Sequence, residues 1–140
     1  MSAKSEPSGF KFEPRAFSAA PQQFGKSSKP LRPAAGYGAR DLRFVAAQLQ
    51  HRVANAVREE LLDMQMTLED LVKSMRPPSP GMTYDRLVRI QRGETLMQIA
   101  DLMNWAQRFG TVRSLLSDEQ SWTPADPGDR FEGEGSPSER

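Results

Sequence analysis

The stretch GMTYDRLVRIQRGE, residues 81–94, carries the signals of one short amphipathic helix. Thr83 is a favourable N-cap, because its hydroxyl can accept a hydrogen bond from a free backbone N–H of the first turn. Leu87 and Ile90 lie three positions apart and predict the buried face of the helix. Gly93 is typical of the residue that follows a helix end. Charged side chains dominate the other positions, so the polar face meets either water alone or a negatively charged partner.

The positions of proline predict how far the folded part extends. Five of the eleven prolines lie in residues 1–33, three lie at or beyond Pro124, and the other three lie within residues 76–80. Two long segments, residues 40–76 and 81–123, contain no proline. Because proline is excluded from helix interiors, we expect helices in both segments, separated by a loop.

Apolar residues recur at steps of three and four in these segments, and no alternating strand pattern is present. The sequence therefore predicts an all-α fold of four helices with a short fifth one. The first helix is long, about six turns, and carries His51 on its surface. We expect the fourth helix to bury Trp105 beside the other members of its apolar stripe. The expected helices span residues 41–63, 67–76, 83–92, 95–110 and 111–116, and the apolar stripe of the fourth is Leu96, Ile99, Leu102, Met103, Ala106 and Phe109.

The net charge of +1 hides an uneven distribution along the chain. Residues 1–39 carry six Lys and Arg against two Glu, whereas residues 117–140 carry two Arg against seven acids. We therefore predict a disordered basic tail over residues 1–39, a folded domain over residues 40–120 and a disordered acidic tail over residues 121–140. Such polarised flanks are typical of proteins that bind polyanions, and they also serve solubility alone.

Several function classes are excluded by composition. The chain has no cysteine and a single histidine, so disulfides, zinc fingers and histidine-based triads have no residues to build them. We expect neither an enzyme nor a bound metal or cofactor. The start of the chain has no apolar signal region, and 18 apolar residues never run together. We expect a soluble cytoplasmic protein that is associated with the nucleoid and not with a membrane.

Three motifs carry a resemblance to a known family. They are TLEDLVKSM, then TYDRLVRIQRGE, then IADLMNWAQRFG. Over roughly residues 53–116 the chain resembles the lambda-repressor/Cro-type helix-turn-helix family, also called xenobiotic-response-element-type domains. The resemblance implies a lambda-repressor-like helix-turn-helix fold, a function as a sequence-specific DNA-binding regulator of transcription, and double-stranded DNA as the partner. A recognition helix of this kind lies in the major groove of DNA, with its N-terminal residues near the base edges.

The resemblance implies DNA-contact roles for six residues at and around the predicted third helix. An arginine can make a bidentate contact to guanine, a role open to Arg86 or Arg89. Asp85 can accept a hydrogen bond from a cytosine amino group, or hold one of these arginines in position. The hydroxyls of Thr83 and Tyr84, and the guanidinium of Arg92, are candidates for phosphate contacts.

Two departures from the family pattern leave a second interpretation open. Residues 76–80, RPPSP, are inserted ahead of the turn, and Leu68 stands where many family members have a glutamine. These two departures, together with the nearly neutral charge of residues 40–116, favour a small adaptor protein. Such an adaptor, transcription-associated or antitoxin-like, would dock a protein partner and not DNA.

The flanking segments predict further partners. The first helix is longer than the opening helix usual in the family, and regulators of this kind bind paired DNA half-sites as dimers. Both features favour a homodimer. The basic tail with its phenylalanines suggests either a phosphate-tracking arm or a docking motif for a protein partner.

Overall fold

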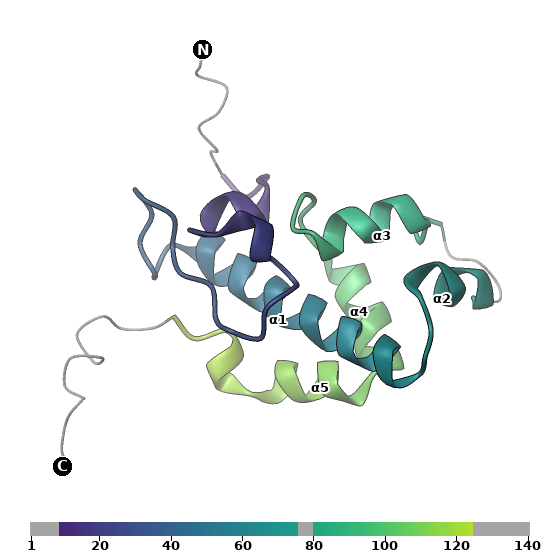
Figure 1. The fold of residues 1–140 in the computed structure, drawn as a ribbon. Coiled ribbons are helices and arrows are strands. Elements are labelled where there is room, and N and C mark those ends of the chain that lie inside the picture. The colour runs from purple at the N-terminus through teal and green to yellow at the C-terminus, as the bar shows by residue number, and fades with distance from the viewer. Residues whose placement is uncertain (1–8, 76–79, 125–140) are drawn as a thin grey trace.

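A computed structural model of the protein describes residues 9–75 and 80–124 (Figure 1). Within these ranges the chain is helical, with no strand and one isolated bridge between Ser18 and Pro33. The all-α prediction is therefore confirmed for this part of the chain. The α-helices are α1 (Leu42–Asp63), α2 (Leu68–Ser74), α3 (Tyr84–Gln91), α4 (Ile99–Arg108) and α5 (Gly110–Ser117), and the short 3-10 helices are η2 (Pro14–Phe17), η3 (Pro21–Gln23) and η4 (Glu119–Ser121).

The long helix α1 runs through the middle of the fold, and the other helices pack around it (Figure 1). The Asp41 side chain caps it by accepting a hydrogen bond from the backbone N–H of Arg43 at 2.9 Å. Its last helical residue is Asp63. The predicted start and end of this helix are both confirmed, because the cap and the apolar periodicity are local signals.

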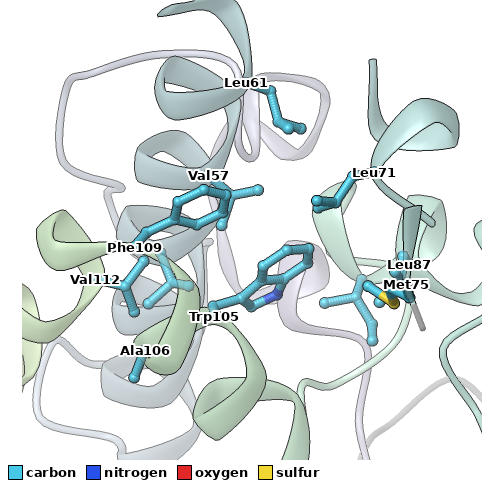
Figure 2. Close-up of a cluster of buried hydrophobic side chains, with 11 residues drawn as sticks. Val57, Leu61, Leu71, Met75, Leu87, Trp105, Ala106, Phe109 and Val112 are labelled. Atoms are coloured by element: carbon cyan, nitrogen blue, oxygen red, sulfur yellow. The ribbon is translucent and has the colours of Figure 1, made fainter. Parts of the chain in front are cut away.

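The main hydrophobic core lies between the second half of α1 and helices α2 to α5 (Figure 2). Trp105 is fully buried in it and stacks on Phe109 with ring centroids 5.9 Å apart. The prediction that Trp105 packs in the core is confirmed. The buried members are Val53, Val57, Leu61, Leu71, Met75, Leu87, Ile90, Trp105, Ala106, Phe109 and Val112.

A second hydrophobic cluster joins the N-terminal segment, residues 9–39, to the first half of α1. Phe17 and Phe24 are 0% and 1% exposed, and Phe44 of α1 is 5% exposed beside them. The prediction of a disordered tail over residues 1–39 is wrong for residues 9–39. Fully burying a phenylalanine contributes about 1.5–3 kcal/mol, so these aromatic side chains outweigh the polar composition on which that prediction rested.

The start of α4 differs from the expected one. Thr67 and Thr83 cap α2 and α3 at the predicted starts of these helices, but α4 begins at Ile99 and not at Thr95. Gln98 is its N-cap residue, and the backbone N–H of Gln98 donates to the side chain of Asp101 at 2.9 Å. The three residues before Gln98 stay outside the helix, and the side chain of Gln50 in α1 binds the backbone of two of them, Thr95 and Met97.

The exposed surface of α4 also differs from the expected one. Ile99 and Met103 are 78% and 43% exposed, so the prediction that both are buried is wrong. Trp105 and Ala106 fill the inner face of α4, together with Asp101. The helix is therefore rotated relative to the predicted stripe.

No helix among the described residues is both long and apolar enough to span a membrane. Most of the predicted insertion at residues 76–80 and most of the acidic tail lie outside the described residues.

Candidate nucleic-acid interface

Helix α3 is fixed to the core by one face and presents the other to solvent. Leu87 and Ile90 are both 0% exposed, as the sequence predicts. The Thr83 hydroxyl accepts a hydrogen bond from the backbone N–H of Arg86 at 3.3 Å, which fixes the first turn. On the outer side, Tyr84 is 44% exposed. The inner face thus sets the orientation in which the outer face is presented.

Arg86 is held in an ion pair with α4. Its Nη1 and Nη2 atoms donate to the two carboxylate oxygens of Asp101, each at 2.7 Å, and Nη1 also donates to the Gly81 carbonyl at 3.2 Å. The hydrogen bonds to Asp101 raise the pKa of Arg86 above its ordinary value. The Asp101 side chain is 1% exposed, so the pair is closed to water on that side. This geometry gives Arg86 a role in joining α3 to α4, and it does not support the predicted guanine contact.

Arg89 and Arg92 are the arginines of the outer face. Arg89 is exposed, and its guanidinium makes no hydrogen bond or ion pair with any residue in the described ranges. Arg92 is 58% exposed and lies 3.8 Å from a carboxylate oxygen of Glu94. Asp85 is exposed in the first turn of the same helix. Of the predicted contact residues, Thr83, Tyr84, Asp85, Arg89 and Arg92 are thus all accessible at or beside α3.

The C-terminal end of α3 is braced by two glutamines. Gln50 of α1 donates from its Nε2 to the carbonyls of Ile90 and Thr95, each at 2.9 Å, and its Oε1 accepts from the N–H of Met97 at 2.7 Å. Gln91 donates from its side chain to the Ala54 carbonyl of α1 at 3.0 Å. These bonds join the end of α3 and the loop that follows it to α1.

The N-terminal segment adds a cation to the same end of α3. The backbone N–H of Arg15 donates to the Gly93 carbonyl at 3.0 Å. The guanidinium of Arg15 lies 3.5 Å from a carboxylate oxygen of Glu94. Phe24 packs against Gly93, whose φ of +76° favours glycine. Arg15 therefore lies near Arg92, which the sequence does not indicate because the two residues are far apart along the chain.

His51 fastens the N-terminal segment to α1. It is 1% exposed, so its predicted surface position is wrong. Its Nδ1 accepts from the N–H of Gly25 and its Nε2 donates to the carbonyl of Lys29, each at 2.9 Å. Both bonds together require the neutral ring. Burial, the largest cause, lowers the pKa of His51, and the nearby charges of Arg52 and Arg58 act in the same direction.

No protein-family model matches the chain, and no curated protein or solved structure does. Among the residues that the structure describes, no three His, Asp or Glu side chains gather in a way that could hold a metal ion. The outer face of α3 is the candidate site that the geometry itself supports.

Proposed function

We propose that the protein binds double-stranded DNA through the outer face of α3 and acts as a sequence-specific regulator of transcription. The observation that carries this proposal is the pairing of an anchored inner face with an accessible cationic outer face. Leu87 and Ile90 fix the helix, while Arg89 has no partner among the described residues and Arg92 has only a distant one. An α-helix fits the major groove, and positive side chains on it meet phosphates and base edges.

We propose a different role for each residue of this face. Arg89 is the residue proposed to reach guanine, since its guanidinium is accessible and uncommitted. Arg92 lies at the helix end and is proposed to contact phosphate. Tyr84 supplies a hydroxyl at the opposite end, and Asp85 beside it is proposed to accept from a cytosine amino group. Arg86 is a positioning residue here, because its contact with Asp101 fixes the first turn of α3 relative to α4.

Titration into labelled random-sequence duplex DNA, followed by fluorescence anisotropy at several salt concentrations, tests the proposal. We expect binding to weaken with salt at a slope of roughly −0.9 per phosphate contact. The double variant Arg89→Ala/Arg92→Ala should lose at least about tenfold in affinity for selected sites. Arg40→Ala is the control, because Arg40 is an exposed arginine that precedes α1 and is not part of α3. Equal affinities for the double variant and the control would refute the role of α3.

Recognition as a homodimer remains part of this proposal. The first half of α1, which the sequence offers as one dimer surface, is covered by the N-terminal segment at Phe44 and Ala47. Leu42 in the same half of α1 is 65% exposed, so part of that surface stays available to a second subunit. Sedimentation velocity at working concentrations tests this point, and a monomer in the presence of a palindromic site would refute it.

A second candidate function, docking of a protein partner, is favoured by α4. Ile99 and Met103 lie one helical turn apart and are both exposed, although large apolar side chains usually turn inward. A photo-crosslinking amino acid at position 103 in cells should then capture one defined partner. The same amino acid at position 108, which is also exposed but lies on another side of α4, is the control. Capture of nothing at position 103 would count against this candidate.

A further inference from the structure

A cavity of about 800 Å³ lies between the N-terminal segment, the first half of α1 and the last described residues. Leu31 and Pro33 form part of one wall, and Phe44 and Val45 of α1 form part of another. Gln48 of α1 holds the wall in place, since its side chain accepts from the N–H of Leu31 at 2.9 Å and donates to the carbonyl of Leu31 at 3.2 Å. The cavity is therefore preformed, apolar over much of its surface, and of the size that small ligands occupy.

The charged residues that line this cavity within residues 9–75 and 80–124 are both cationic. Arg32 and Arg52 lie in its wall, and no aspartate or glutamate from these ranges does. Neither guanidinium makes a hydrogen bond or ion pair with any residue within residues 9–75 and 80–124. The wall also includes Ser121, whose side-chain oxygen is buried and has no partner among the described residues. Buried polar groups are usually hydrogen-bonded, so the Ser121 hydroxyl is unsatisfied. The two guanidinium groups are accessible and have N–H donors free for a ligand.

We propose that this cavity binds a small amphipathic carboxylate, whose apolar body packs on Leu31 and Phe44 and whose carboxylate pairs with Arg52. The guanidinium fork matches the two oxygens of a carboxylate, and no acid among the described wall residues would repel the carboxylate of the ligand. Arg52 is partly buried and Arg32 is exposed, so Arg52 makes the stronger contact. This site is separate from the outer face of α3.

His51 is the neighbour of Arg52 in sequence and the single histidine of the chain, which makes it a local reporter. The positive charge of Arg52 is one of the causes that lower the pKa of His51. An anion bound at Arg52 offsets that charge and moves the pKa of His51 upward. An anion bound elsewhere on the surface leaves it unchanged.

Isothermal titration of the full chain with octanoate tests the proposal. Acetate has the carboxylate without the apolar body, and octanol has the body without the charge. We expect octanoate to bind at one site, and each of the other two to bind at least about tenfold more weakly. Arg52→Gln should weaken octanoate binding about tenfold and Arg32→Gln about threefold, because the exposed cation is screened by water. Arg40→Gln is the control, since Arg40 is exposed and does not line the cavity.

Proton NMR of the His51 ring in the presence of octanoate provides the second readout. An upward shift of the His51 pKa in the natural sequence, lost in Arg52→Gln, supports the assignment. No binding of octanoate, equal binding of octanol, or binding that Arg52→Gln and Arg40→Gln leave alike would overturn it.

Discussion

The ion pair between Arg86 and Asp101 yields the sharpest prediction, because the structure separates it from the neighbouring Arg89. Removing Arg86 leaves the Asp101 carboxylate, which is 1% exposed, with the backbone N–H of Gln98 as its remaining hydrogen-bond donor among the described residues. Breaking a buried pair costs about 3–5 kcal/mol, since an uncompensated charge stays behind. The Arg86 side chain is 24% exposed, so water screens part of this cost, and we expect about 3 kcal/mol for Arg86→Ala.

Urea unfolding followed by tryptophan fluorescence measures this effect. With a slope of about 2 kcal/mol per molar urea, the midpoint of Arg86→Ala should fall by about 1.5 M. Arg89→Ala is the matched control on the same helix and should stay within about 0.5 kcal/mol of the natural sequence. Asp101→Asn combined with Arg86→Ala should recover part of the loss, because no buried charge remains. Equal midpoints for Arg86→Ala and Arg89→Ala would refute the structural role of Arg86.

Three further predictions concern the N-terminal segment and the residues that contact it, and each is measured by urea unfolding. Phe17→Ala should lower the free energy of unfolding by about 3–5 kcal/mol, whereas Phe10→Ala, at an exposed position, should change it little. Gly93→Ala should cost at least about 1 kcal/mol more than Gly36→Ala; both glycines have a positive φ, but only at Gly93 would a Cβ meet a phenylalanine ring, at 2.7 Å. Because burial lowers the pKa of His51 in the folded state, the unfolded chain takes up a proton first, and stability should fall as the pH drops below about 6.5. His51→Gln should flatten that pH dependence between pH 7.5 and 5.5.

Local signals in the sequence were sufficient to predict most helix starts. Asp41, Thr67 and Thr83 each cap the helix that the sequence assigned to them. The expected start of α4 at Thr95 was wrong, because Gln50, which lies 45 positions earlier, binds the Thr95 carbonyl outside the helix. The acid at Asp101, three residues after Gln98, is the signal that would have located the true start.

Long-range contacts account for the remaining differences. Apolar periodicity predicts one buried face for a helix. The first half of α1 has a second buried face, which the N-terminal segment covers. His51 and Gln50 therefore look like surface residues in the sequence, although they are 1% and 3% exposed. At the candidate site, the sequence predicted the buried side of α3 and its exposed charges. It could not predict that Arg86 turns toward α4, because the partner of Arg86 is set by packing and not by helical periodicity.

The hydrogen bond between Arg15 and Gly93 has a consequence for the order in which the chain folds during its synthesis. The N-terminal segment leaves the ribosome before α1, so the cluster around Phe17 and Phe24 lacks Phe44 and Ala47 until α1 has been made. The contact of Arg15 with the end of α3 waits longer still, until Gly93 has emerged. Apolar side chains that stay uncovered during this interval are targets for chaperones and for aggregation. In a shortened chain that begins at α1, the side chains of Phe44 and Ala47 would stay exposed to solvent permanently.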